Sequence, residues 1–347
     1  MTTEPESFPR RHARTQRFTL GAPRSFTVAP DGTRVVFLRS SSGTERAGAL
    51  WVLDPADGVE RPAADPVALL GGADEDLPPE ERARRERTRE GGAGIVGYAT
   101  DAAVELASFA LSGRLFTAEL RAGTARELPV AGPVVDPRPS PDGRHVAYVA
   151  RGALRVVGAE GGDDRALAEP EGEGITYGLA EFIAAEEMAR HRGFWWAPES
   201  DRLLVARVDD TPVRRWWIAD PARPEREPHH VAYPAAGTPN AEVRLFVVGL
   251  DGVRTEVSWD RARYPYLARV HWSEGVRRCS WCRRGTSAAS CTWRWTRTRG
   301  RPGWCMPTKI RFGWIFSPVC RAGRPRDSSS GSRTKAARAS SPWANGP

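Results

Sequence analysis

Two adjacent glutamates stand where a predicted amphipathic helix would continue its apolar face. Within residues 178–190, three apolar side chains repeat at the spacing of one helix face: Leu179, Phe182 and Ile183. Glu186 and Glu187 occupy the next two positions of that face. Adjacent carboxylates that face a core repel each other and lose hydration unless a cation meets them. The pattern leaves two interpretations open: a site for a cationic ligand group, or two acids at a helix end that frays into water.

A second charged segment, residues 78–90, is predicted to form a helix. It has proline at its start and Gly91 and Gly92 after its end, which are typical start and stop signals. Taken alone, the segment is typical of a solvated helix with ion pairs between residues four apart. Three arginines stand in its second half: Arg85, Arg87 and Arg89.

Neither a metal site nor a catalytic serine is indicated by the sequence. Cys279 and Cys282 have a CxxC spacing, but no second pair with ligand spacing accompanies them, and no histidine follows His271. No Gly-x-Ser-x-Gly occurs, and a Ser-His-Asp enzyme without a downstream histidine has no general base. We therefore predict no metal, no cofactor and no catalytic residue within these 347 residues.

The elements that must position the charged segments are mainly β-strands. Three segments follow a plan of strand, turn and strand, with Pro-Asp-Gly or Pro-Glu-Ser in the turn: residues 26–37, 134–149 and 194–206. A further strand follows each, and residues 94–128 hold a weaker copy. Four-strand units that recur every 40–60 residues or so are typical of propeller blades. An irregular β-sandwich is the alternative interpretation.

The composition changes abruptly near residue 275. Residues 276–347 hold 16 Lys and Arg and one acid, Asp327, whereas the first 275 residues carry a net charge of −7. The tail also holds all five cysteines, six of the 13 tryptophans and no leucine. The net charge of +8 for the whole chain is thus a property of the tail, which lacks the composition of a folded domain.

The tail permits three interpretations. A basic arm with interleaved tryptophans would suit phosphate contact and base stacking in a nucleic acid, and a metal site is the second. The third is translation out of frame, because residues whose codons carry G or C in the middle position are enriched there, as a shifted reading of a GC-rich gene would produce. We favour the third and predict a disordered, basic, out-of-frame tail over residues 276–347, with residues 1–275 as the genuine domain.

No membrane span or leader is indicated. The chain has no stretch near the roughly 18 consecutive apolar residues of a membrane helix. Its N-terminal basic residues are not followed by the apolar run of a secretory signal. We expect a cytoplasmic protein.

Several of these segments carry a resemblance to a known family. Residues 180–188, Ala-Glu-Phe-Ile-Ala-Ala-Glu-Glu-Met, and residues 193–198, Gly-Phe-Trp-Trp-Ala-Pro, resemble the double-Glu motif and the Trp-Trp-Ser-Pro strand of the dipeptidyl peptidase IV family. Residues 233–240, Tyr-Pro-Ala-Ala-Gly-Thr-Pro-Asn, look like its Tyr-Pro-x-Ala-Gly-x-x-Asn stretch. Residues 85–89, ahead of Gly94-Ile95, resemble the arginine-rich helix of its cytosolic members. The resemblance covers most of residues 1–275.

The resemblance implies a fold and a set of site residues. The family combines an eight-bladed β-propeller with an α/β-hydrolase domain, so the chain would be all-β, with about four to five blades and short helical insertions. Glu186 and Glu187 would hold the N-terminal ammonium of a peptide substrate. One of Arg85, Arg87 and Arg89 would lie near the substrate carbonyl.

The resemblance also implies a function. The chain would be the substrate-recognition propeller of a serine exopeptidase that releases N-terminal dipeptides, inactive by itself because it lacks the hydrolase domain. Its partners would be peptides with a free N-terminus, with no nucleic acid and no membrane, and family members are often homodimers. The alternative function is a standalone propeller scaffold with a basic nucleic-acid-binding tail.

Overall fold

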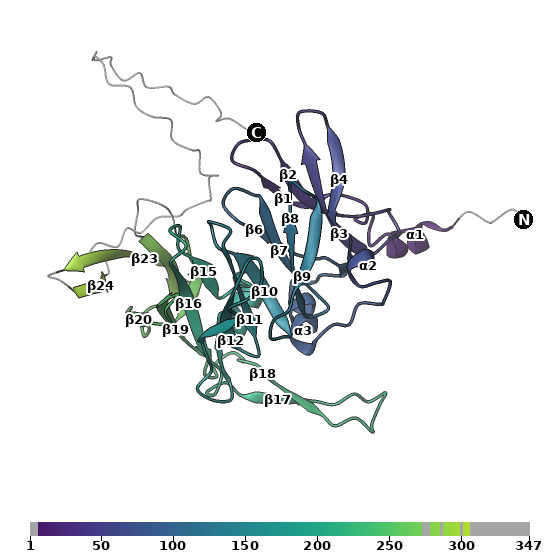
Figure 1. Ribbon diagram of the computed structural model, residues 1–347. Coiled ribbons are helices and arrows are strands. Elements are labelled where there is room, and N and C mark those ends of the chain that lie inside the picture. Colours follow the sequence, from purple (N-terminus) through teal and green to yellow (C-terminus); the bar gives the residue numbers. More distant parts are fainter. Residues whose placement is uncertain (1–5, 273–277, 285–286, 299–300, 306–347) are drawn as a thin grey trace, which may run out of the picture. The chain divides into compact units, whose positions relative to one another are not determined.

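The fold consists of antiparallel sheets that follow one another along the chain (Figure 1). A computed structural model describes residues 6–272, 278–284, 287–298 and 301–305. These lie in one compact unit, residues 1–312; a second unit, residues 313–347, lies outside the described residues. Among the described residues, no helix has the length and apolar character needed to cross a membrane.

The first three sheets are four-stranded meanders, the first of which gains one short parallel strand. The first sheet contains β1 (Arg24–Val28), β2 (Val35–Ser40), β3 (Ala47–Asp54) and β4 (Val59–Ala64), with β5 (Ala93–Gly94) beside β3. The second contains β6 (Ala99–Thr100), β7 (Leu106–Leu111), β8 (Arg114–Glu119) and β9 (Thr124–Leu128). The third contains β10 (Val134–Pro139), β11 (His145–Ala150), β12 (Ala153–Gly158) and β13 (Arg165–Ala168).

The fourth and fifth sheets continue the series. The fourth contains β14 (Ile175–Tyr177) and β15 (Phe194–Trp196), both paired with β16 (Arg202–Asp209), and then β19 (Glu242–Gly249) and β20 (Arg254–Val257). The fifth contains β21 (Tyr266–Arg269), β22 (Arg278–Arg284), β23 (Ser287–Thr298) and β24 (Arg301–Cys305).

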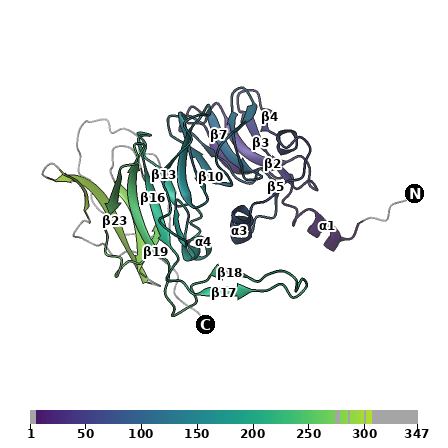
Figure 2. The same ribbon diagram turned by 60° about the horizontal axis from the view of Figure 1, so that its bottom comes forward.

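Within the described ranges, a hairpin and four short helices interrupt the sheets. The hairpin, β17 (Arg215–Ile218) and β18 (His229–Ala232), lies between β16 and β19 in the chain and extends away from the sheets (Figures 1 and 2). It exposes Trp217, whose ring stacks on His230. The helices are α1 (Phe8–Arg14), α2 (Pro66–Leu69), α3 (Pro79–Thr88) and α4 (Phe182–Glu187).

Each sheet packs against the next one in the chain, and β11 in the third sheet is buried on both of its faces. In β11, Ala147 and Val149 pack toward the fourth sheet, whereas Val146 and Tyr148 pack toward the second. Side chains alternate between the two faces of a strand, so a strand buried on both faces is apolar throughout. The continuous apolar runs in the sequence are therefore middle strands of stacked sheets.

The recurrent turn has the same geometry in three sheets. Gly32 and Gly143 have φ values of +72° and +71°, and Ser200 has a φ of +62° at the equivalent position. In each turn, the amide of this residue donates to a carbonyl three residues earlier: Ala29, Ser140 and Ala197. The positive φ explains the glycine in Pro-Asp-Gly, while the third turn holds serine in the same conformation.

These observations confirm the predicted all-β class, with blade-like four-strand units and short helical insertions. Strands β22–β24 lie in the segment for which the sequence predicts no packed structure, and their backbone continues the sheet that begins with β21. Residues 306–347 lie outside the described residues, so the boundary at residue 275 stays a prediction.

Candidate functional site

The double-Glu segment forms the short helix α4, which is shorter than its apolar pattern predicts. The helix begins after Glu181, whose carboxylate caps it by accepting a hydrogen bond from the Ala184 amide at 2.6 Å. Leu179 therefore lies outside the helix. The expectation that Glu186 and Glu187 extend a core-facing stripe is wrong, because both side chains are exposed at the end of a six-residue helix.

Glu186 and Glu187 have no counter-charge within the described part of the chain. Neither carboxylate forms an ion pair or a hydrogen bond with a described residue, and no basic residue stands in the last turn of α4. The carboxyl end of a helix carries partial negative charge, so acids are unfavourable there and cations are favourable. Two free carboxylates at this end can therefore bind a cationic group such as an ammonium.

A buried ion pair fixes the helix that carries these glutamates. Arg190 Nη2 lies 3.2 Å from Glu181 Oε1, and both side chains are buried. Arg190 also donates from Nε to the Leu267 carbonyl of β21 at 2.8 Å and from Nη1 to the Arg192 carbonyl at 2.9 Å. Burial raises the pKa of Glu181, although the charge of Arg190 acts against this rise. The pair thus ties α4 to the fifth sheet.

This ion pair is not among the contacts predicted from the sequence. Glu181 directly precedes the apolar residues Phe182 and Ile183, which is where an N-cap acceptor stands. That position was the available signal, although glutamate is not among the strongly preferred N-cap residues.

Helix α3 lies beside α4 (Figure 2). The exposed guanidinium of Arg87 lies 5.6 Å from the centroid of the Phe182 ring. On its other side, Phe182 meets the ring of Tyr233 edge-on at 5.2 Å. Burial and the charge of Glu181 raise the pKa of Asp210, and the charge of Arg87 opposes this rise. The arginine-rich helix, the double-Glu helix and the Tyr-Pro stretch therefore meet at Phe182.

The Tyr-Pro stretch also closes a small pocket beside α4. Asn240 Nδ2 donates to Tyr266 Oη at 3.0 Å, which joins the end of the stretch to β21. The pocket is lined by the Tyr-Pro stretch, by β21 and by α4. Its lining includes Glu181, Phe182, Asp210, Asn240 and Tyr266. Sequence segments that carry the predicted motifs are thus brought to one place.

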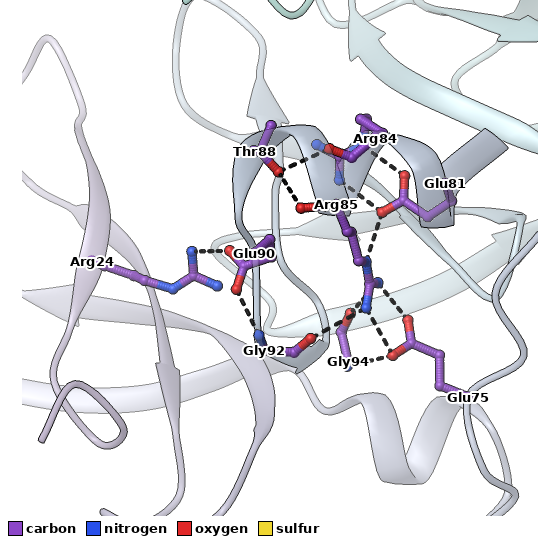
Figure 3. Close-up of polar contacts among 9 residues, drawn as sticks. All are labelled: Arg24, Glu75, Glu81, Arg84, Arg85, Thr88, Glu90, Gly92 and Gly94. Carbon is purple, nitrogen blue, oxygen red and sulfur yellow. Dashed lines mark hydrogen bonds and ion pairs between the residues drawn. The ribbon is translucent and has the colours of Figure 1, made fainter. Parts of the chain in front are cut away.

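Arg85 is occupied by contacts within the protein (Figure 3). Its guanidinium donates to Glu81 Oε1 from Nε at 2.8 Å and to Glu75 Oε1 from Nη2 at 2.6 Å. It also lies 3.4 Å from the carbonyl oxygens of Gly92 and Gly94, and the Gly94 amide donates to Glu75. Only 5% of Arg85 is exposed, so it has no donor left for a ligand.

The contacts of Arg85 show that α3 is not the fully solvated helix that its sequence indicates. Glu81 pairs with both Arg84 and Arg85 and is buried with the latter. Burial alone would raise the pKa of Glu81, but hydrogen bonds and charge from the two arginines lower it below its ordinary value. One face of α3 is therefore anchored in the protein by compensated charges.

Arg89 lies at the end of α3 and lines a cavity that α4 does not border. It ends α3 in a left-handed conformation, with a φ of +54°, and its exposed side chain lines a separate cavity with Gln16, Arg24 and Arg46. Of the three arginines that the sequence singles out, Arg87 is the one whose guanidinium lies against α4.

The described residues contain no cluster of three or more His, Cys, Asp or Glu side chains that could hold a metal ion.

A family model described as the dipeptidyl peptidase IV (DPP IV) N-terminal region matches residues 104–322, beyond the predicted boundary at 275. Dipeptidyl peptidase 4 of Felis catus is 26% identical over 161 residues, which are 42% of this chain and 21% of that protein. Dipeptidyl peptidase 8 of Homo sapiens is 25% identical over 137 residues, or 36% of this chain and 15% of that protein. Inactive dipeptidyl peptidase 10 of Rattus norvegicus is 29% identical over 115 residues, or 30% and 14%.

Among solved structures, the crystal structure of Porphyromonas gingivalis dipeptidyl peptidase 4 matches with a TM-score of 0.62 and 16% identity. The match covers 89% of this chain and 43% of that chain, and at this identity it shows the fold. The chain spans between 14% and 21% of the length of the three curated relatives.

Proposed function

Because the chain belongs to the family of the dipeptidyl peptidase IV N-terminal region, we propose that it is the substrate-recognition propeller of a dipeptidyl peptidase IV-like serine exopeptidase. The match confirms the family resemblance that the motifs indicate. The observation that carries the functional proposal is the pair of exposed carboxylates, Glu186 and Glu187, that end α4 without a counter-charge among the described residues.

In this proposal, Glu186 and Glu187 bind the N-terminal ammonium of a peptide. Two carboxylates and one ammonium leave a singly negative cluster, which resolves the repulsion of adjacent acids at a helix end. With the ammonium fixed, the reach to the nucleophile sets the length of the product, so that dipeptides are released. Arg87 is the arginine that we assign to the substrate carbonyl, since Arg85 is internally paired and Arg89 lines another cavity.

Catalysis itself is not assigned to any of the 347 residues. They include no Gly-x-Ser-x-Gly and no histidine after His271, so we propose that this chain by itself binds peptides and does not cleave them. One relative carries the name inactive dipeptidyl peptidase 10, so family membership alone does not decide activity. The standalone scaffold with a nucleic-acid-binding tail stays the alternative function.

The out-of-frame origin of residues 276–347 remains part of the proposal, and two observations bear on it in opposite directions. The composition changes sharply near residue 275, whereas the family match and strands β22–β24 run beyond it. The nucleotide sequence decides between them: a one-base correction near codon 275 should open a long frame that contains Gly-x-Ser-x-Gly.

The site is tested in the protein encoded by that corrected frame. Replacing Glu186 or Glu187 by Gln keeps the shape and removes one charge. A charge-assisted hydrogen bond to a cation contributes roughly 1.5–3 kcal/mol, so kcat/KM for free-amine dipeptidyl substrates should fall about 10–150-fold. Arg87→Met should also lower kcat/KM, whereas Arg89→Met is the matched control and should leave it unchanged.

Two further measurements distinguish substrate binding from catalysis. N-acetylated peptides lack the cation, so they should be poor substrates that lose nothing in the Gln variants. The 347-residue chain should release no product at all. Wild-type kcat/KM in both Gln variants would reject the site and leave the family assignment intact.

A second copy of the chain is the other partner that we propose, as expected for this family. The hairpin β17–β18 supports it, because Trp216 and Trp217 are exposed together on one projecting element. Sedimentation of the Trp217→Glu variant should then give a monomer where the parent chain gives a dimer.

A further inference from the structure

A cavity lined mainly by arginines lies beside the segment that follows α4. Its charge is opposite in sign to that of Glu186 and Glu187. The cavity has a volume of about 400 Å³ and is bounded by α3, by β10, by the segment that follows α4, and by β21. Its lining includes five arginines and one acid: Arg84, Arg138, Arg190, Arg192, Arg269 and Asp136. None of the residues proposed for peptide binding lines it.

Three of the five arginines are neutralised within the protein. Arg84 pairs with Glu81 at 2.6 Å, Arg138 with Asp136 at 2.7 Å, and Arg190 with Glu181 at 3.2 Å. The other two, Arg192 and Arg269, have no carboxylate partner among the described residues. The cavity therefore carries two positive charges that the described chain does not compensate.

Of these two arginines, Arg192 loses more of its hydration, because it is half-buried whereas Arg269 is exposed. Its guanidinium lies over the Trp195 ring, 5.6 Å from the centroid, which restrains the group. Its N–H donors have no hydrogen-bond acceptor among the residues that the structure describes. Burial and the neighbouring Arg138 lower the pKa of Arg192 to about 10, and Asp136 acts in the opposite direction. A stacked, partly desolvated guanidinium is the group that proteins use to bind phosphate and carboxylate in two-point geometry.

We propose that this cavity binds a small dianion of the phosphate, sulfate or dicarboxylate type, held between Arg192 and Arg269. Two uncompensated cations match two negative charges, and a cavity of about 400 Å³ accommodates a small molecule. The residue that follows Arg190, His191, also lines the cavity and offers a further hydrogen-bonding group.

Sulfate is the probe for the test, because its double charge does not change near neutral pH. Calorimetric titration of the 347-residue chain with sulfate, at constant ionic strength, should show saturable binding. Arg192→Gln and Arg269→Gln should each weaken it about tenfold, because each removes a charge-assisted hydrogen bond. Arg144→Gln is the matched control. Arg144 is exposed on the turn between β10 and β11, so its substitution should leave sulfate binding unchanged. Inorganic phosphate and succinate then show whether the site prefers tetrahedral or dicarboxylate anions.

Thermal unfolding separates ligand binding from a structural role. Without anion, Arg192→Gln should unfold at or above the parent temperature, because it removes a half-buried charge that no described carboxylate compensates. With sulfate, the parent chain should gain stability and this variant should not. Glu186→Gln should leave sulfate binding unchanged, so the two proposals fail separately. Absence of saturable sulfate binding, or equal losses in Arg144→Gln and Arg192→Gln, would overturn the dianion site.

Discussion

Helices α3 and α4 are both short and rich in charge, but they differ in whether these charges are paired within the protein. On α3, Arg85 donates to two carboxylates and two carbonyl oxygens and is buried with them. At the end of α4, Glu186 and Glu187 are exposed and have no described partner. A high density of charge therefore does not identify a binding site by itself. What matters is whether the fold supplies the counter-charge.

The largest expected effect is the loss of the Arg85 cluster. Arg85→Met leaves Glu75 without an ion-pair partner among the described residues and leaves the buried Glu81 with Arg84 alone. Removing one partner of a buried ion pair costs about 3–5 kcal/mol. Chemical denaturation should show this loss in the free energy of unfolding. Arg87→Met, on the exposed face of the same helix, should change it by less than about 1 kcal/mol. If the two variants are equally stable, the cluster is not structural.

An intermediate effect concerns the pH dependence of stability. The pKa of Glu81 is lowered in the folded chain by Arg84 and Arg85, against the effect of burial, from an ordinary value of 4.5. The unfolded chain therefore takes up the proton first, so the stabilisation from Glu81 is present above about pH 5 and is lost as the pH falls through the folded-state pKa.

The matched measurement is denaturation of Glu81→Gln between pH 7 and pH 3. The parent chain should be more stable than the variant at pH 7, and the difference should narrow as the solution becomes acidic. Glu86→Gln, exposed on the same helix, serves as the control and should differ from the parent chain by a small and constant amount. A difference that widens toward low pH would contradict the assigned direction.

The smallest effect on stability is expected at the carboxyl end of α4. In the absence of peptide, Glu186→Gln and Glu187→Gln should keep the stability of the parent chain or raise it by roughly 0.3–1 kcal/mol, because each removes an acid from a helix carboxyl end. The free energy of unfolding measures this directly. A loss above about 1 kcal/mol in either variant would mean that these glutamates support the fold, and the contrast with Arg85 would disappear.

The repeating β architecture and the positions of the charged segments can be predicted from the sequence alone. Apolar runs, Pro-Asp-Gly turns and the proline and glycine limits of α3 are local signals, because they arise from backbone preference and from the alternation of side chains along one strand. The double-Glu motif was also visible as a local pattern. Glu186 and Glu187 are exposed, against the expectation, because α4 buries Ala184 and Ala185 and leaves Phe182 and Ile183 only half-buried.

Which charges are compensated depends on contacts between elements that are distant in the sequence. Arg85 meets Glu75, which lies ten residues away, and Arg190 bonds to Leu267, which lies 77 residues away on another sheet. The same is true of Arg192 and Arg269, which share one cavity only because β21 packs beside the segment that follows α4. Counter-charges are supplied by the packing of distant elements, so no spacing rule along the chain can show which arginine is buried and which faces a ligand.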